Sequence, residues 1–273
     1  MANLRELFPE FFQLEISSED LSTKTDNLIV LDTNYLLEVI KSPTIVSKEY
    51  VDALKKVKKN IYIPYLVALE FNFNKSGLKK KKKQDIHNYK NHVRNKVVEF
   101  IEEINEIPFI NDDNKKEFTN DIIELTDNFS VELQATIERK INSLVTDEQE
   151  NLYNELIKII EDRIGDIYTQ EWIDEIQKEG EERFENSIPP GFNDKAKEKN
   201  DSYSKSTRRY GNILYQRKFG DLLIWKDILK HAKTNQKGKK VIFITDDGKS
   251  GKKTDLLYKY SGVTVGPHIH LMN

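Results

Sequence analysis

Acidic side chains come directly after two short apolar runs that have the character of buried β-strands. Asp32 follows Leu28–Leu31, and Asp246 and Asp247 follow residues 241–245. Burial of a carboxylate next to an apolar strand costs free energy unless a hydrogen bond or an opposite charge compensates it. A bound cation is one form of compensation that would also have chemical use.

Two further acids lie on predicted helices. Glu70 is in the helix that follows the second apolar run, residues 61–64, and Asp221 is near the start of "GDLLIWKDIL". Strand ends and the first turns of the following helices face one edge of a parallel sheet. Four carboxylates there would repel one another, and their pKa values would rise. A divalent cation relieves this, and oxygen-only ligands favour Mg²⁺ or Mn²⁺ over zinc.

Each acid also has an ordinary structural explanation. Asp32 could cap the helix after the first strand, and Glu70 could be a solvated helix residue. The Asp-Asp-Gly sequence at residues 246–248 is typical of a turn, and Asp221 could favour a helix N-terminus through its charge. The placement of all four at one predicted edge is what favours the cation site.

The elements that must position these acids alternate between strands and helices. The sequence predicts strands over residues 27–31, 61–64, 241–245 and 262–267, and helices over 34–40, 47–60, 65–73 and 219–233. Short buried strands alternating with helices predict an α/β fold with a central parallel sheet. Right-handed crossovers then bring the carboxyl ends of the strands to one edge.

The middle of the chain differs in composition. Residues 77–187 are rich in Lys, Glu, Asp and Asn, with apolar residues at spacings of three and four. This predicts three or four long helices, without the sustained heptads of a coiled coil. "IPPG", residues 188–191, ends them. We therefore predict a first part of the core at 1–76, a helical insert at 77–187 and a second part of the core at 188–273.

Composition limits the possible function classes. The 273 residues carry a formal net charge of −3, so a nucleic-acid site must be a local basic patch rather than a global field. The chain has no cysteine, which excludes disulfides and cysteine zinc sites and fits a cytoplasmic location. Its apolar runs are too short for a signal peptide or a transmembrane helix, so we expect no membrane association.

Four motifs together resemble the PIN-domain superfamily of metal-dependent nucleases. They are "VLDTNYLLEV", "YIPYLVALEFNFNK", "KFGDLLIWKDIL" and "FITDD". With "IPPGFNDKAK" they resemble a bacterial PIN-like subgroup that carries a long helical insert. The resemblance implies a PIN-like (Rossmann-like) central parallel sheet flanked by helices, with a large all-helical insertion.

The resemblance also assigns roles to residues. It implies catalytic, metal-binding acids at Asp32, Glu70, Asp221 and Asp247, which would hold one or two Mg²⁺ or Mn²⁺ ions. Asp246 becomes an additional metal ligand, and Asn34 and Thr245 auxiliary polar residues. The sequence departs from the subgroup after the fourth motif, where "GKSGKKTDLL" replaces an acidic, tryptophan-containing segment.

Substrate contacts are expected from local polar and basic groups. Lysine and arginine neutralise phosphates, and aromatic rings can stack on unpaired bases. The predicted contacts are Lys75, Asp194, Lys195, Arg208, Arg209, Lys218 and Lys249. The run Lys79–Lys83 is more typical of a solvated helix face.

The predicted function is a metal-dependent phosphodiesterase, an endoribonuclease that acts on RNA rather than DNA, with a toxin or antiphage defence role. A partner protein or a further C-terminal domain would fit the subgroup. One alternative is a catalytically inactive PIN-like scaffold or nucleic-acid-binding module. Another is a haloacid dehalogenase-like phosphatase, which is disfavoured because that chemistry needs a second acid where this chain has Asn34.

Overall fold

The computed structural model describes residues 3–8, 11–12, 16–22, 24–105, 112–144, 147–195, 206–235, 239–246 and 254–272. Asp247 and Lys249 lie outside these residues, as does the side chain of Lys195. The elements before the long helices are α1 (Leu4–Leu7), η2 (Ser18–Leu21), β1 (Leu28–Leu31), α2 (Thr33–Lys41), α3 (Thr44–Val57), η3 (Lys58–Asn60) and β2 (Ile61–Tyr62). The remaining elements are α4 (Tyr65–Asn105), α5 (Asp112–Leu144), α6 (Asp147–Ile160), α7 (Gln170–Glu185), η4 (Phe192–Lys195), β3 (Thr207–Tyr210), β4 (Ile213–Gln216), η5 (Arg217–Phe219), α10 (Gly220–Asn235), β5 (Val241–Ile244), β6 (Leu257–Tyr260), β7 (Val263–Pro267) and α11 (Ile269–Met272).

A parallel sheet with the order β2-β1-β5 forms the centre of the molecule. The four side chains of β1 alternate between its faces, and all of them are at most 4 % exposed. Both faces of the sheet are therefore covered, as expected for parallel strands connected by helices. The predicted α/β fold with a parallel sheet is confirmed.

Amphipathic helices cover this sheet. Leu36, Leu37 and Ile40 of α2 are buried at the helical spacing that the sequence predicts, and Leu222 and Leu223 of α10 are fully buried. α2 packs against α4, α3 packs against α6, and α10 packs against both α4 and α7. Burial of these stripes fixes the ends of the strands relative to α4 and α10.

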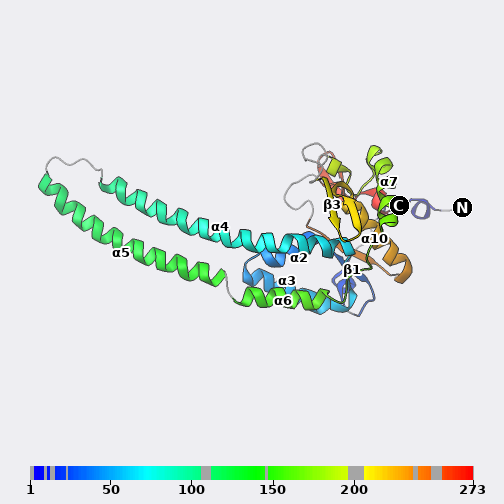
Figure 1. Cartoon of the computed structure of the whole chain (residues 1–273), viewed down its shortest axis with the longest axis horizontal. Coiled ribbons are helices and arrows are strands. Elements are labelled where there is room, and N and C mark those ends of the chain that lie inside the picture. The colour runs from blue at the N-terminus through cyan, green and yellow to red at the C-terminus, as the bar shows by residue number, and fades with distance from the viewer. Residues whose placement is uncertain are drawn as a thin grey trace.

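The two longest helices, α4 and α5, form an antiparallel hairpin that projects far from the sheet (Figure 1). α4 runs without interruption through the predicted boundary at residues 76 and 77, so Glu70 lies on the same helix as the projecting part. At its base, Lys82 Nζ donates to the carbonyls of Ile40 (3.1 Å) and Ser42 (2.7 Å), the last turn of α2 and its C-cap. This lysine secures the hairpin to the core.

The helices that follow the hairpin return to the core. Leu156 of α6 and Ile173 of α7 are fully buried in the same cluster as the strands. After α6, the chain runs beside β2, where the Ile63 amide donates to the Arg163 carbonyl and the Gly165 amide donates to the Ile63 carbonyl, both at 2.9 Å. The second half of the predicted insert therefore contributes directly to the central core.

Two antiparallel hairpins accompany the parallel sheet. β3 and β4 pair across a turn at Gly211, whose φ of +55° suits glycine. β7, predicted as a final strand of the alternating series, instead pairs with β6 outside the parallel sheet. Val263 and Val265 are 67 % and 55 % exposed there. Its antiparallel partner β6 is a strand that the sequence analysis did not predict.

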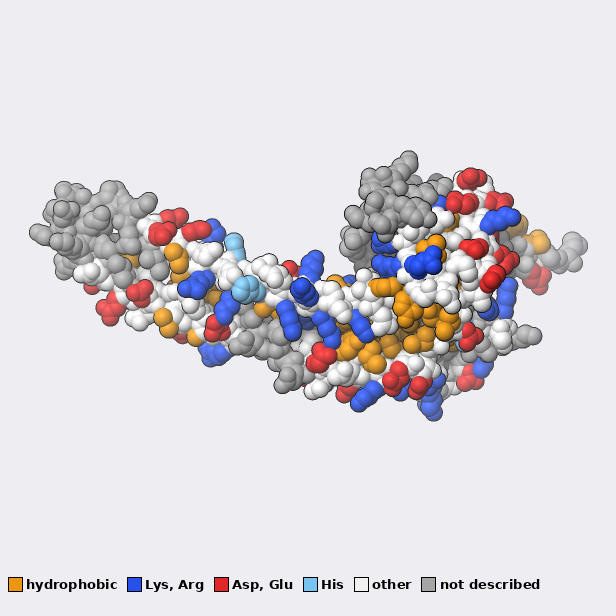
Figure 2. Space-filling view, viewed as in Figure 1, with side chains coloured by type: hydrophobic (Ala, Val, Ile, Leu, Met, Phe, Trp, Pro, Cys, Tyr) orange, Lys and Arg blue, Asp and Glu red, His pale blue; other side chains and the backbone are white. Residues whose placement is uncertain are grey.

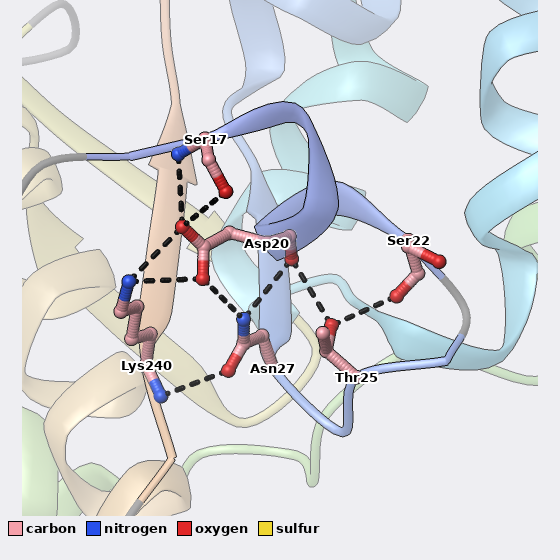
Figure 3. Close-up of polar contacts among 6 residues, drawn as sticks. All are labelled: Ser17, Asp20, Ser22, Thr25, Asn27 and Lys240. Carbon is pink, nitrogen blue, oxygen red and sulfur yellow. Dashed lines mark hydrogen bonds and ion pairs between the residues drawn. The ribbon is translucent and has the colours of Figure 1, made fainter.

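Residues 17–27, which precede β1, hold the starts of β1 and β5 together (Figure 3). Lys240 Nζ lies 2.9 Å from Asp20 Oδ1, and Asn27 donates through Nδ2 to the carbonyl of Asp20. The Lys240 amide donates in turn to Asn27 Oδ1 (3.2 Å). This cluster lies at the edge of the sheet opposite the strand carboxyl ends.

Candidate active site

A cavity of about 390 Å³ opens at the carboxyl ends of β1 and β5. Its walls come from the start of α2, the first turns of α4 and α10, the turn at residues 190–194, the β3–β4 hairpin and residues 254–256. The charged side chains that line it are Asp32, Glu70, Asp194, Asp221, Asp255, Arg208 and Arg217. Five carboxylates against two guanidinium groups give the described part of this cavity an excess of negative charge.

Asp32 occupies two roles at once. It is the N-cap of α2, where its Oδ1 accepts from the Thr33 amide at 2.7 Å. Its other oxygen, Oδ2, accepts from the Thr245 hydroxyl at 2.8 Å and from Asn34 Nδ2 at 3.5 Å. The cap explains how a carboxylate is tolerated at the end of a buried strand, and it leaves Oδ2 facing the neighbouring strand end in the cavity.

Glu70 reaches the cavity from the second turn of α4. Its Oε2 accepts from the Thr33 hydroxyl at 3.0 Å. A Cβ placed on Gly220 would lie 3.6 Å from Glu70 Oε1, so this carboxylate lies against the start of α10. The partial positive charge of a helix N-terminus favours an acid there. Burial and the negative charge of Glu70 raise the pKa of the neighbouring Tyr215 hydroxyl to about 12, so that this phenol stays neutral at physiological pH.

Asp221 lies in the first turn of α10 and is exposed within the cavity. The residue that packs beside it is Gly191, which has a φ of +96°. A Cβ on Gly191 would lie 3.1 Å from the Phe184 ring and 3.6 Å from Asp221 Cβ, so only glycine fits this turn without strain. The Pro-Pro-Gly sequence thus brings a tight turn against the third acid.

Asp255 is a cavity residue that the sequence analysis missed. It is only 6 % exposed, and its Oδ2 accepts from the amides of Gly191 (2.9 Å) and Asn193 (3.1 Å). Through these bonds Asp255 holds the turn that places Asp194 at the cavity wall. The sequence offered one signal, an acid just before β6 in the otherwise basic segment "GKSGKKTD".

The predicted basic residues separate into two groups. Arg208 lines the cavity, with its guanidinium 4.4 Å from the centre of the Phe73 ring. Arg217, in the same basic stretch, also lines it. Arg209 is exposed and lies outside the cavity lining, as expected for the neighbour of Arg208 on a strand.

Two predicted substrate lysines are directed to other partners. Lys218 is 7 % exposed and pairs with Glu181 on α7 at 2.9 Å. Lys75 Nζ lies 5.9 Å from the centre of the Tyr153 ring on α6. Both lie outside the cavity lining, as does the half-buried Asp246. Thr245, Asn34 and Asp194 line the cavity as the sequence analysis expected.

The donor set of the cavity suits a hard divalent cation. Carboxylate, hydroxyl and amide oxygens surround the space, and these are the ligands that Mg²⁺ and Mn²⁺ prefer. Among the residues that the structure describes, no three acids or histidines form a ready metal-binding group. Asp247, the fourth acid predicted from the sequence, lies outside that part of the chain.

A family model described as a PIN-like domain matches residues 28–271, from the first residue of β1 into α11. The chain belongs to the PIN-like domain family. The resemblance of the four acidic motifs is therefore confirmed at the level of the family. Neither the curated proteins nor the solved structures give a match.

PIN-like domains belong to a nuclease-type superfamily that typically uses divalent metals. The match begins at β1, which positions Asp32, and continues across both long helices to the C-terminal hairpin. The helical hairpin is thus enclosed within the matched region. Within the described residues, no helix is long and apolar enough to cross a membrane.

Proposed function

We propose that this PIN-like protein is a Mg²⁺- or Mn²⁺-dependent nuclease that cleaves phosphodiester bonds internally in RNA. The observation that supports it most directly is the cavity at the strand carboxyl ends, where five carboxylates from separate segments meet two arginines. Negative charge in excess of the arginines favours binding of a cation, and the arginines favour a phosphate beside it.

Asp32, Glu70 and Asp221 are the proposed metal-holding residues, because they approach the cavity from the junction of β1 and α2, from α4 and from α10. Asp247 is a further proposed ligand on sequence grounds, with Asp246 beside it. A bound Mg²⁺ or Mn²⁺ would supply a water of lowered pKa as nucleophile and would stabilise negative charge on the phosphate oxygens.

The side chains around these acids have positioning roles. The hydroxyls of Thr33 and Thr245 donate to Glu70 and Asp32, which fixes the orientation of both carboxylates. A carboxylate that is already oriented loses little freedom when a cation binds, and this favours binding. The amide of Asn34 adds a weaker bond to Asp32 at 3.5 Å.

Substrate binding is assigned to Arg208 and Arg217, which line the cavity from the β3–β4 hairpin and the turn after it. A guanidinium group can bind two phosphate oxygens at once, which orients the backbone of the nucleic acid. The Phe73 ring holds the Arg208 guanidinium in place. Asp194 is proposed to contact the substrate from the turn at residues 190–194, and Lys195 is a further proposed contact on sequence grounds. A cytoplasmic toxin or antiphage role is proposed for the cleavage.

The test is a cleavage assay on single-stranded RNA, single-stranded DNA and the corresponding duplexes, with Mg²⁺, Mn²⁺ or EDTA. The variants are Asp32→Asn and, as a matched control outside the cavity, the exposed Asp166→Asn. We expect metal-dependent cleavage of single-stranded RNA that Asp32→Asn abolishes and Asp166→Asn retains.

Undiminished cleavage by Asp32→Asn would overturn the proposal. RNA binding without cleavage under any metal would instead identify an inactive nucleic-acid-binding module. Hydrolysis of a generic phosphomonoester, with no action on polynucleotides, would identify a phosphatase.

A further inference from the structure

The projecting hairpin carries its charges at opposite ends. We refer to residues 77–105 of α4 and 112–144 of α5 as the arm. The half nearer the core, residues 77–96 and 131–144, has ten Lys and Arg against three Asp and Glu. The half nearer the tip, residues 97–105 and 112–130, has two Lys and Arg against nine Asp and Glu. Figure 2 shows basic side chains along the arm near the core and acidic ones toward its free end.

Large apolar side chains of the arm are exposed. Val97 is buried within the hairpin, whereas Tyr89, Phe100, Leu125 and Phe129 are between 52 % and 67 % exposed. Two helices packed side by side bury only the stripe that each turns to the other. A second apolar stripe on such a hairpin marks a surface that another element covers.

An apolar groove lies at the core end of the arm, between α4, α5 and the turn that joins α2 to α3. Its volume is about 790 Å³, and its walls include Leu78, Ile86, Tyr89 and Ile137. Four lysine side chains, Lys41, Lys81, Lys82 and Lys140, are also part of its lining, against one acid, Asp85. The groove therefore suits an apolar segment that carries negative charge.

The groove and the exposed residues near the tip lie on one face of the arm. At 3.6 residues per turn, Tyr89 and Phe100 are about three turns apart on α4 and share a face. Leu125 and Phe129 are about three and two turns from Thr136 of the groove lining on α5. One face thus presents a basic groove near the core and an acidic apolar surface near the tip.

We infer that the arm is a self-association surface, which pairs with the arm of a second copy of this chain in antiparallel orientation. In that arrangement the acidic apolar tip of each copy lies in the lysine-rimmed groove of the other. Both contacts are made twice about a two-fold axis, so the assembly closes as a dimer. An arm about 40 Å long and two helices, roughly 20 Å, wide offers on the order of 800 Å² per partner, the size of a stable interface.

The basic half of the arm also suits nucleic acid, but several of its lysines are already engaged. Lys79 pairs with Glu150 at 2.9 Å, Lys90 pairs with Glu138, and Lys96 pairs with Glu99. A phosphate-binding track also gives no role to the exposed Phe100 and Phe129. A second copy accounts for the basic groove, the apolar stripe and the acidic tip together.

The test uses the full chain and two charge reversals at exposed positions. The tip variant is Glu103→Lys and Asp121→Lys together, which lie on the face of Phe100 and Leu125, and the base variant is Lys81→Glu and Lys140→Glu together, which line the groove. Light scattering coupled to size-exclusion chromatography should give twice the 32.0 kDa chain mass for the native protein and a single chain mass for each variant. An equimolar mixture of the two variants should restore the dimer, because each reversed end then meets an opposite charge.

Replacing an exposed apolar side chain with a polar one provides an independent test. Phe129→Ser should weaken the dimer at least tenfold, whereas Ile167→Ser, which replaces an even more exposed residue on the core, should leave it unchanged. Circular dichroism should show unaltered helix content in every variant. The inference is overturned if the native protein stays monomeric throughout the micromolar concentration range. It is also overturned by a base variant that keeps the native mass but loses affinity for RNA, or by a mixture of the reversed variants that stays monomeric.

Discussion

The acids at the two edges of the parallel sheet differ in how their negative charge is compensated. At the edge where the strands start, Asp20 accepts from the Ser17 amide and pairs with Lys240 at 2.9 Å. These contacts, the backbone bond first, lower the pKa of Asp20 to about 2. At the edge where the strands end, five carboxylates share a cavity with two arginines. The first arrangement is locally compensated, and the second leaves negative charge in excess.

Asp227 shows what a purely structural carboxylate looks like in this molecule. It is 6 % exposed and accepts from the hydroxyls of Tyr62 (2.7 Å) and Tyr168 (2.8 Å) and from the Tyr65 amide (3.1 Å). Burial and the negative charge of Asp227 raise the pKa of both phenols, which remain donors at physiological pH. The structure thus completes the bonding of Asp227 from the protein alone, whereas Asp32 and Glu70 face a polar cavity.

The largest expected effect follows from a change at Glu70. Glu70→Gln keeps the shape of the side chain and its bond from the Thr33 hydroxyl, but it removes one negative charge from the cavity. Nuclease activity should fall by about 100-fold or more, which corresponds to about 3 kcal/mol of transition-state stabilisation. The denaturation midpoint should stay the same or rise, because carboxylate repulsion decreases.

The measurement is kcat/KM for RNA cleavage together with a urea titration of the same preparation. A loss of activity that tracks a loss of folded protein would contradict the distinction between the two edges. So would a variant that cleaves RNA at the native rate.

Substitution of Asp227 should have the opposite effect, a loss of stability without a loss of activity. Asp227→Ala leaves two buried tyrosine hydroxyls and one backbone amide without their acceptor, which should cost about 3 kcal/mol of unfolding free energy. Specific activity of the folded fraction should be retained at temperatures below the transition. Urea denaturation followed by circular dichroism measures the change, and Asp166→Ala, an exposed acid nearby, is the control. Equal midpoints for the two variants would show that the Asp227 cluster contributes little.

Local patterns were enough to predict the residues whose positions depend on single elements. Asp32 follows a strand and caps a helix, Glu70 lies in the second turn of α4, and Asp221 lies in the first turn of α10. Periodicity therefore placed all three at the edge where the structure has the cavity. The β3–β4 hairpin had a signal that was not used, the Gly211-Asn212 pair between two short segments. It determines that Arg208 and not Arg209 lines the cavity.

Residues that depend on contacts distant in sequence were not predictable in this way. Asp255 gains its place only because the turn at Gly191 folds against it, 64 residues earlier in the chain. The continuity of α4 also escaped, because Gly77 lies near the predicted boundary and is a poor helix former. In the structure α4 is held there by tertiary contacts, including Lys79 with Glu150 at 2.9 Å.

Metal binding should have a smaller effect, an increase in the stability of the native protein. If the cavity holds the cation, Mg²⁺ or Mn²⁺ at about ten times its dissociation constant should stabilise the native protein by about 1.4 kcal/mol. This shift in melting temperature should disappear in Asp32→Asn and persist in Asp166→Asn. Calcium-free buffers and isothermal titration with Mn²⁺ separate specific binding from screening. An identical shift in both variants would place the cation elsewhere.

The smallest effect is expected at the opposite edge and depends on pH. The folded-state pKa of Asp20 is about 2, below the value of about 3.9 for an unfolded chain. The stability from this group is therefore fully present above pH 4 and is lost as the pH falls toward 2. Asp20→Asn should lower the melting temperature slightly at pH 6, and the difference should vanish near pH 2. Because the ion pair with Lys240 is close to solvent, 1 M NaCl should reduce the difference at pH 6. A difference that is the same at both pH values would assign the contribution of Asp20 to shape rather than to charge.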